Sequence, residues 1–398
     1  MEEALQLAID SERLKSAGVS LPLVEVDFTS FFPGTDKAEA LRLLEPVGKV
    51  TSLQAPHRIV DAILRDSLVA EENKPFRAKA EKDESSYGRR LRRVFTQNAT
   101  ALFELCPTAL LLGMWDSTGP KGGLGAKFER AMVSEIVGIN AQPGVKTSSR
   151  LDTLAIQKDA GPLYRRPDGG YTTDPSQAID ELKEGRPTGK KVLFKFNNKG
   201  ADVFHDPKEA SFPDQGRPSE ANHGNVMPAI DYRRDQNRNL IKDEEGRPIP
   251  VGGFTITSAE QTVVLSFPAL RRLRFPINGK PDLKVDEAAR TVLAALGLCA
   301  AALAAEAGLD LRSRCLLWPI APLAWELLGK PGIKEGGLTL EADDAIQLLK
   351  EAIEAATSKE IGLPWRKDPL QLVPSDDLVK LVVKSQQLAL ALGGEGGE

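Results

Sequence analysis

The sequence predicts an α+β fold that is interrupted by a long irregular insertion. Predicted strands occupy the first part of the chain and recur after residue 253, whereas the last third has helical patterns. Residues 142–253 differ from both parts, because Pro, Gly, Asp and Asn recur there and long apolar runs are few. Strands followed by a block of helices are typical of α+β proteins.

These composition shifts divide the chain into four parts. Residues 1–141 begin the folded domain, 142–253 form the insertion with a hairpin or two, and 254–392 complete the strands and add C-terminal helices. A long irregular stretch in a compact protein is usually functional or mobile. The glycine-rich residues 393–398 are expected to be a flexible tail.

Apolar periodicity predicts the individual elements in order. Spacing of apolar residues by three and four indicates a helix, and a short β-branched run indicates a strand. Ile59, Ile63 and Leu64 give this helical spacing to residues 57–68. The other predicted elements before the insertion are a helix over 2–17, a strand over 21–28, an extended segment over 49–53, a helix over 95–105, a strand over 108–115 and a strand or helix with a buried apolar set over 129–139.

After the insertion, two strands are expected within residues 254–267, around a turn at 258–260. The expected helices then cover residues 285–307, 316–328, 342–357 and 375–392. The strongly apolar stretch 292–305 is too short to span a bilayer, so we interpret it as a buried helix.

The composition is that of an ordinary soluble protein, with 41% hydrophobic and 27% charged residues. No signal peptide is apparent, and the three cysteines show no motif spacing, which favours a reducing compartment over a disulfide framework or zinc site. We therefore predict a cytoplasmic protein without a membrane partner. The net charge of −4 does not exclude nucleic acid, because binding depends on where the charges cluster.

The most informative segment is residues 115–127, which combines glycines, hydroxyls, lysines and Trp115. Glycines let backbone N–H groups approach an anion closely, and a tryptophan can stack on a base. The P-loop pattern fails because Ala126 precedes Lys127 and no hydroxyl follows it. Phe128 also stands where a dinucleotide motif needs its third glycine. A polynucleotide backbone therefore remains as the ligand, with a plain glycine-rich turn as the alternative.

Basic residues cluster in three further segments. Residues 87–93 and 271–274 are rich in arginine, and residues 146–150 combine Lys146 and Arg150 with hydroxyls. Such clusters suit phosphate oxygens. The alternatives are a solvated face, pairing with acids such as Asp83 and Glu84, or a plain loop.

Two other constellations could carry chemistry. His57, Asp61 and Ser67 could form a base, its orienter and a nucleophile, but Ser67 is too distant along a helix. We favour an Asp61–Arg65 salt bridge, with Arg58 or Arg65 on phosphate. Four residues of the insertion could be drawn as metal ligands, although their spacing matches no known motif and solvated loop positions are the better interpretation. They are His205, Asp206, Asp214 and His223.

Long strings of sequence resemble a known family. Residues 57–67, 107–110, 115–119 and 122–128 resemble the backbone subunit of subtype I-G (formerly I-U) CRISPR Cascade surveillance complexes, in the RAMP superfamily. The close match covers roughly residues 50–150.

This resemblance implies a modified RRM-like (ferredoxin-like) palm, with the insertion as thumb or fingers that order on assembly. Copies of the subunit would line one guide RNA (crRNA) as a helical filament, contact other Cascade subunits, and leave the bases free to pair with target DNA in antiviral defence. No cofactor, metal or catalytic residue is expected. The residues expected to bind RNA are Arg58, Arg65, Trp115, Ser117, Thr118, Lys121, Gly122, Gly123, Lys127, Lys146 and Arg150.

Two alternatives belong to other classes of protein. Some relatives in this superfamily are RNA endonucleases that process the guide or cleave target RNA, and His57 or Asp116 would then be the suspected catalytic residue. A nucleotide-binding enzyme that uses the glycine-rich loop is the third possibility.

Overall fold

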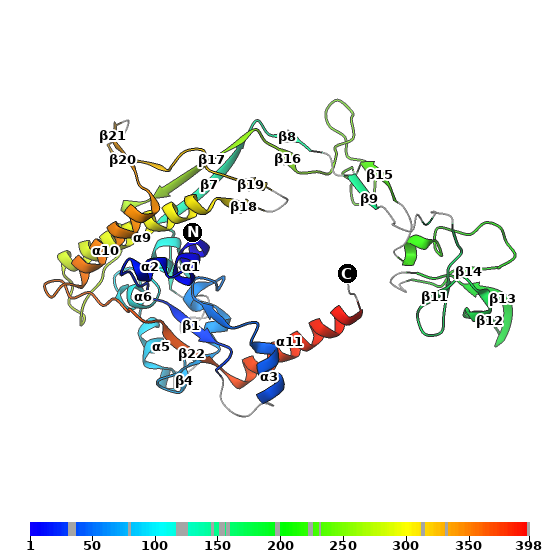
Figure 1. The fold of residues 1–398 in the computed structure, drawn as a ribbon, viewed down its shortest axis with the longest axis horizontal. Helices are drawn as coiled ribbons and strands as arrows, with labels where there is room; N and C mark the ends of the chain where they lie inside the picture. The colour runs from blue at the N-terminus through cyan, green and yellow to red at the C-terminus, as the bar shows by residue number, and fades with distance from the viewer. Residues whose placement is uncertain are drawn as a thin grey trace. The chain divides into compact units, whose positions relative to one another are not determined.

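The computed structural model is a mixed α/β structure with a mixed central sheet (Figure 1). It describes residues 1–30, 37–78, 81–116, 126–144, 147–150, 156, 160–195, 200–221, 226–230, 232–311, 315–330 and 333–395. The chain forms two compact units, one comprising Met1–Val137 and Glu260–Glu398 and the other comprising Gly138–Ala259.

The larger unit is organised around a five-stranded sheet in the order β2-β1-β22-β3-β4. Strand β22, from the C-terminal part of the chain, pairs in parallel with β1, and the register aligns Val24 with Leu370. The other neighbouring pairs are antiparallel. Val24, Val26 and Leu370 are fully buried, so the middle of the sheet lies in the core. The strands are β1 (Val24–Asp27), β2 (Lys49–Thr51), β3 (Ser67–Val69), β4 (Lys74–Pro75) and β22 (Leu370–Pro374).

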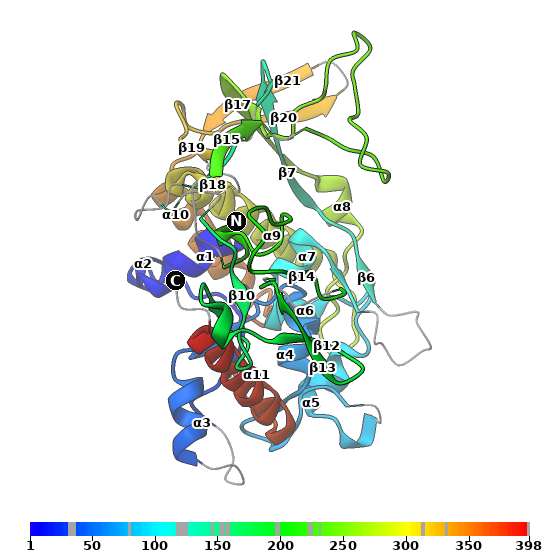
Figure 2. The same ribbon diagram turned by 90° about the vertical axis from the view of Figure 1, so that its right-hand side faces the viewer.

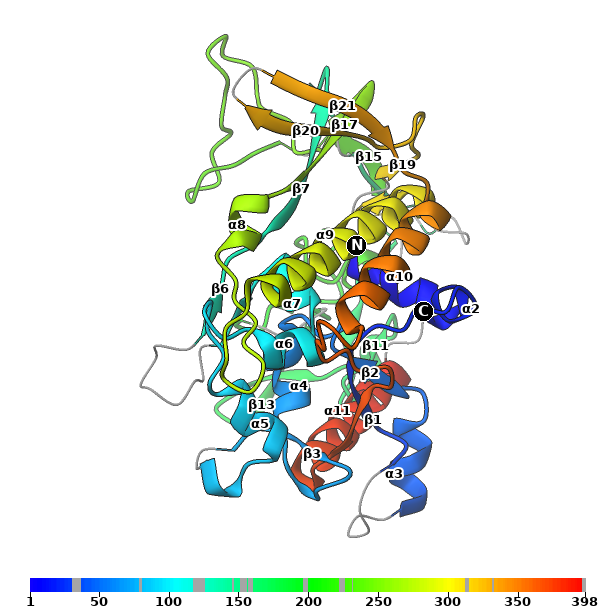
Figure 3. The same ribbon diagram turned by 90° about the vertical axis from the view of Figure 1, so that its left-hand side faces the viewer.

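The longest helix, α9 (Leu283–Ala307), packs against α10 (Ala342–Thr357) and α1 (Glu2–Asp10), as Figure 3 shows for α9 and α10. The Asp282 carboxylate accepts a hydrogen bond from the Lys284 N–H and caps its first turn, and Gly308 follows its last turn with φ of 71°. Burial of apolar side chains around α9 makes it a core helix. The remaining helices of this unit are α2 (Arg13–Ser16), α3 (Lys37–Leu44), α4 (Ala62–Arg65), α5 (Ser86–Leu91), α6 (Thr100–Leu105), α7 (Thr108–Leu112), α8 (Phe267–Arg271) and α11 (Asp376–Glu395), with 3₁₀ turns η1 (Arg58–Val60) and η2 (Glu81–Asp83).

Four two-stranded ladders complete the elements described for the larger unit. They pair β5 (Met114–Trp115) with β6 (Lys127–Phe128), β7 (Met132–Ile139) with β17 (Ser258–Leu265), β18 (Leu309–Leu311) with β19 (Cys315–Leu317), and β20 (Ala324–Lys330) with β21 (Ile333–Thr339). The β5–β6 ladder ends where the glycine-rich segment begins.

The smaller unit is built from short strands, among which β12 and β13 lie side by side (Figure 2). Its described core cluster is small and centres on Tyr164, Ala178 and Leu193. The ladders are β12-β13-β14, β10-β11, β15-β9 and β16-β8. The strands are β8 (Gln142–Pro143), β9 (Thr147–Arg150), β10 (Tyr164–Arg165), β11 (Tyr171–Thr172), β12 (Asp180–Lys183), β13 (Arg186–Val192), β14 (Phe204–His205), β15 (Val226–Ile230) and β16 (Phe254–Thr255), with 3₁₀ turns η3 (Pro175–Gln177) and η4 (Pro218–Ala221).

The structure confirms the strands predicted at 21–28 and 49–53 and the helices predicted at 285–307, 342–357 and 375–392. The helix predicted at 95–105 is shorter, because α6 starts at Thr100. The predicted helix 2–17 is broken at Glu12, which has φ of 57° and separates α1 from α2. The turn predicted at 258–260 is wrong, because these residues are the start of β17.

Two further predictions fail for identifiable reasons. Residues 108–115 form helix α7 and then β5, because a short buried apolar run does not distinguish strand from helix and Gly113, with φ of 83°, ends the helix. Residues 316–328 form parts of β19 and β20 instead of a helix; Pro319 and Pro322 lie between these strands and cannot donate helical hydrogen bonds.

Residues 57–68 are not one helix, and only the first part of the segment 129–139 is buried, at Ala131 and Met132. Asp61 has an extended backbone with ψ of 147°, so η1 and α4 are separate and positions 57, 61 and 65 do not share one helical face. Within this segment, residues Met132–Ile139 form strand β7, and the side chains of Val133 and Val137 there are 44% and 48% exposed.

By length and composition, α9 could cross a membrane, but 67% of its most apolar window is buried inside the structure. Among the described helices it is the one that meets this test, and a buried core helix meets it equally well.

Candidate nucleic-acid interface

Two segments that the sequence analysis selected separately form the walls of one groove in the larger unit. One wall is η1 with α4, and the other is the end of α7 with β5 and β6. The groove has a volume of about 770 Å³. The lining residues are Pro56, His57, Arg58, Val60, Ala62, Arg65, Leu112, Gly113, Met114, Trp115, Asp116, Lys127, Phe128, Glu129 and Arg130.

The first wall takes its shape from Asp61, which is buried at the junction of η1 and α4. One Asp61 oxygen accepts from the Ile63 N–H at 3.0 Å, and the other accepts from the His57 N–H at 3.2 Å. The Asp61 carboxylate therefore caps helix α4 and does not form the predicted salt bridge with Arg65. Arg65 instead forms a salt bridge with Asp66.

Arg58 is held by its own protein. Its Nε and Nη2 donate to the two oxygens of Glu2 at 2.6 and 2.8 Å, and its Nη1 donates to the Gly113 carbonyl oxygen at 3.0 Å. Burial raises the pKa of Glu2, and Arg58 opposes that shift. These contacts occupy much of the hydrogen-bond donor capacity of Arg58. Its predicted contact with phosphate stays a prediction.

Arg65 lies at the edge of the same wall and is more accessible. It donates from Nε and Nη2 to Asp66 at 2.7 and 2.9 Å, and this hydrogen bonding raises the pKa of Arg65. The side chains are 36% and 48% exposed. Exposed ion pairs of this kind contribute little, so a phosphate can compete with Asp66 for the guanidinium.

The second wall presents an aromatic ring next to a lysine. In the β5–β6 ladder Met114 opposes Phe128, and Trp115 opposes Lys127. Met114 and Phe128 are buried, whereas Trp115 is 64% exposed and Lys127 is also exposed. Strand alternation thus anchors the ladder from one face and leaves Trp115 and Lys127 accessible on the other.

Arg130 is a groove residue that the sequence analysis missed. It is exposed, and no carboxylate lies within ion-pairing distance of Arg130 or Lys127 among the residues that the structure describes. Its signal in the sequence was weak, because it is a single arginine just beyond the glycine-rich segment.

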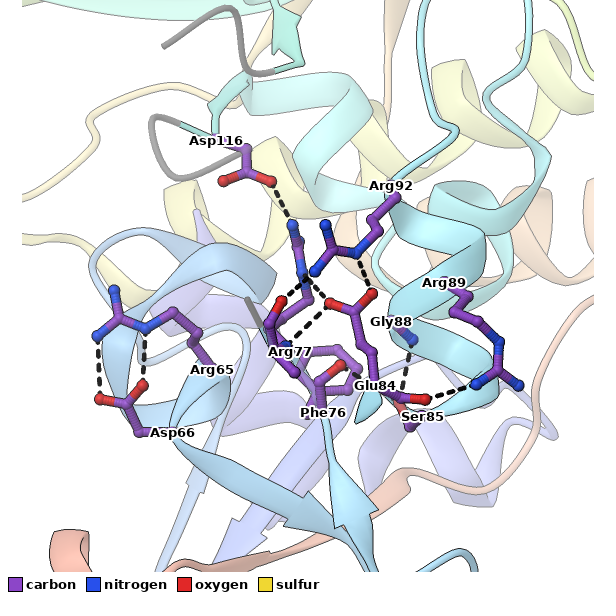
Figure 4. Close-up of polar contacts among 11 residues, drawn as sticks. Arg65, Asp66, Phe76, Arg77, Glu84, Ser85, Gly88, Arg89, Arg92 and Asp116 are labelled. Atoms are coloured by element: carbon purple, nitrogen blue, oxygen red, sulfur yellow. Dashed lines mark hydrogen bonds and ion pairs between the residues drawn. The ribbon is translucent and has the colours of Figure 1, made fainter. Parts of the chain in front are cut away.

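Both acids that line the groove are paired with arginines outside its lining. Asp116 is 5% exposed and accepts from Arg77 Nη2 at 2.8 Å (Figure 4). Glu129 accepts from Arg272 Nη1 at 2.7 Å. Within the described part of the chain, the positive charges of Lys127 and Arg130 are therefore available to a ligand in the groove.

The arginine-rich segments are largely paired. In residues 87–93, Arg90 pairs with Glu104, Arg92 with Glu84 and Arg93 with Glu81. In residues 271–274, Arg272 pairs with Glu129 and Arg274 with Asp286. The alternative of pairing with neighbouring acids is confirmed for these arginines.

Several predicted RNA-binding residues lie outside the described part of the chain. Arg150 is in β9 of the smaller unit, where its backbone pairs with Val226 and its side chain is not described. The residues outside the described ranges are Ser117, Thr118, Lys121, Gly122, Gly123 and Lys146.

The structure does not assemble the other constellations that the sequence suggested. Ser67 is buried and donates to the Ile63 carbonyl oxygen at 2.8 Å, while His57 is exposed. His205 is buried between the Tyr164 hydroxyl and the Ser211 carbonyl oxygen, and His223 lies outside the described residues. Across the described ranges, no three His, Cys, Asp or Glu side chains are placed to hold a metal ion.

A family model matches the N-terminal part of the chain. Residues 1–143 match a family model described as CRISPR-associated protein GSU0053 (Cas_GSU0053). The match supports a CRISPR-associated protein with a role in CRISPR defence. All lining residues of the groove fall inside the matched segment. No curated protein and no solved structure matches.

Proposed function

We propose that this chain is a guide-RNA-binding backbone subunit of a CRISPR surveillance complex, in the RAMP superfamily and resembling subtype I-G. Its copies multimerise along the guide in the cytoplasm, contact other Cascade subunits and present the guide bases to target DNA. The five-stranded sheet is the proposed RRM-like palm, and the unit Gly138–Ala259 provides the proposed thumb or fingers.

The observation that carries the proposal is the placement of Trp115 opposite Lys127 on the wall of the groove. A lysine neutralises a phosphate, and an exposed indole provides a sequence-tolerant stacking surface. Arg65 and Arg130 extend the positive charge along the same groove. An exposed indole beside several cations suits the backbone of a polynucleotide better than a mononucleotide. The absence of a P-loop pattern in residues 115–127 also disfavours a mononucleotide.

Of the two residues suspected in a nuclease, Asp116 has a structural role and His57 is exposed, while the other residues of the His57 constellation also have structural roles. Asp116 is buried against Arg77, Asp61 caps α4, and Ser67 donates to a main-chain carbonyl. A metal-assisted nuclease needs several oxygen ligands around an open coordination position. Of the two described carboxylates that line this groove, Asp116 is held in a buried pair with Arg77 and Glu129 lies in an exposed pair with Arg272, which favours a binding role.

The first experiment asks whether the purified protein carries RNA. Size-exclusion chromatography with absorbance at 260 and 280 nm should show a multimer that contains nucleic acid, or one that forms when guide RNA is added. A protein that stays a nucleic-acid-free monomer with guide RNA present would refute the proposal.

The second experiment measures how RNA affinity depends on salt. For single strands, each lost phosphate contact should reduce the slope of log K against log[salt] by about 0.7. Lys127→Ala and Arg130→Ala should each show this reduction with two guides of unrelated sequence. Lys284→Ala is the matched control, because it removes one exposed positive charge, paired with Glu360, that does not line the groove. Equal slopes in all three variants would contradict the assignment of the groove.

A further inference from the structure

The groove wall that bears Trp115 and Lys127 is anchored by buried charges. The β5–β6 ladder has only two residue pairs, and ladders so short are marginal without outside support. Directly after Trp115, the backbone of Asp116 continues the ladder, because its N–H donates to the Ala126 carbonyl oxygen at 3.0 Å. The Asp116 side chain is buried, so whatever pairs with its carboxylate also fixes the position of the ladder.

Arg77 is one partner of this carboxylate, and it contacts two carboxylates at once. Its Nη2 donates to Asp116 at 2.8 Å, and its Nε donates to Glu84 at 3.2 Å. The second Glu84 oxygen accepts from Arg92 Nε. The four side chains are between 0% and 8% exposed, so Asp116, Arg77, Glu84 and Arg92 form a buried row of alternating charge (Figure 4).

The far end of this row is fixed to the packing of α5. The Ser85 hydroxyl accepts from the Gly88 N–H at 3.1 Å and donates to the Phe76 carbonyl oxygen at 3.2 Å. Gly88 leaves the space that Glu84 needs, since a Cβ there would lie 2.5 Å from Glu84 Cγ and closer still to the Phe76 oxygen. Arg77 therefore connects the closely packed region around α5 to the groove wall.

We propose that Arg77 and Asp116 are positioning residues for RNA binding, whose buried ion pair holds the β5–β6 ladder so that Trp115 and Lys127 face the groove. This inference rests on the proposed function of that groove. Neither side chain needs to touch RNA. Breaking a buried pair by removing one charge is costly, because the other charge is left without compensation.

The proposal predicts that removing the negative charge of Asp116 lowers RNA affinity, which is opposite to the effect expected from charge repulsion. If Asp116 were only a negative charge near the RNA, Asp116→Asn would relieve repulsion and strengthen binding. If it positions the ladder, the same substitution weakens binding, by about tenfold for the loss of one charge-assisted contact. Asp66→Asn is the matched control: it removes an exposed carboxylate paired with Arg65, and it should leave RNA affinity equal or higher.

Arg77→Lys provides a second variant that keeps the charge. A single ammonium cannot repeat the two contacts that Arg77 makes from separate nitrogens, so this variant should also weaken binding about tenfold. The double variant should lose less than the two single losses combined, because both act on one ion pair. If the fold-loss of RNA affinity in the double variant equals the product of the two single fold-losses, the residues act independently and a shared role is contradicted.

A readout without RNA separates this inference from the proposed function. In protein labelled with 5-fluorotryptophan, the ¹⁹F resonance of Trp115 can be assigned with Trp115→Phe among the four tryptophans. It should move in Asp116→Asn and Arg77→Lys but not in Asp66→Asn. An unmoved resonance in folded variants, or a moved resonance with unchanged or tighter RNA binding, would overturn the positioning role. A wild-type protein that binds no RNA would refute the proposed function, while the resonance still decides whether the pair fixes the ladder.

Discussion

Arg58 and Glu2, 56 residues apart in the sequence, meet through two parallel hydrogen bonds between guanidinium and carboxylate. A third bond from Arg58 reaches the Gly113 carbonyl oxygen. Arg58 therefore ties the start of α1 to both walls of the groove, and its main contribution is to hold those walls together.

Arg58→Ala should lower the free energy of unfolding by about 1–3 kcal/mol at pH 7, because Glu2 and the Gly113 oxygen lose their shared donor. Arg65→Ala should change it by less than about 1 kcal/mol, since the Arg65–Asp66 pair is exposed. Denaturant unfolding without RNA measures both. Equal losses in the two variants would contradict the structural role of Arg58.

Glu2 should make a distinct contribution to the pH dependence of stability. Burial raises the pKa of Glu2 above its ordinary value of 4.5, so the folded chain holds this proton more tightly than the unfolded chain. Its contribution to the unfolding free energy therefore declines as pH rises from 4.5 through the raised pKa. Glu2→Gln should gain stability relative to wild type across that window. A difference between wild type and Glu2→Gln that is constant with pH would refute this.

Gly88→Ala should destabilise the domain by about 3 kcal/mol or more, because the new Cβ collides with the Phe76 carbonyl and with Glu84. Gly337→Ala is the control, since a Cβ at Gly337 meets nothing within 4 Å. Thermal unfolding of the two variants should differ clearly. A Gly88→Ala protein with wild-type stability would show that the backbone at Phe76 can move aside at little cost.

The three cysteines should react unequally with a thiol reagent at pH 8. Burial raises the pKa of Cys106, and it raises the pKa of Cys299 to about 12, so both thiols are protonated as well as inaccessible. Cys315 is partly exposed. The folded protein should titrate as one reactive thiol, lost in Cys315→Ser, and the unfolded protein as three. Fast labelling of Cys299 in the folded state would argue against its burial in α9.

The assembled protein should leave guide and target RNA intact in Mg²⁺ or Mn²⁺ when no separate nuclease is added. His57 is exposed in the groove, but the Asp61 carboxylate beside it is used to cap α4. Gel analysis of labelled RNA tests this expectation. Cleavage that disappears in His57→Ala or Asp116→Ala, with RNA affinity retained, would favour the nuclease alternative.

Local sequence determined those helices and strands whose apolar pattern lies entirely within the element itself. The apolar face of residues 342–357 and the buried alanine-rich stretch of α9 specify helices through contacts three and four residues apart. The residue types of segment 115–127 also predicted a phosphate-contacting surface, which stays a prediction. Local patterns failed where a short apolar run fits either structure, as in residues 108–112.

Tertiary structure alone decided how distant segments combine. Leu370 pairs beside Val24, Glu2 reaches Arg58, and Arg77 reaches Asp116 across 39 residues. Sequence periodicity carries no information on such pairings, because they depend on which buried charges and strand edges the folded chain brings within a few ångströms. The sequence by itself therefore determined the residue types of the groove, whereas the fold decided which charges are neutralised from within and which remain to meet a ligand.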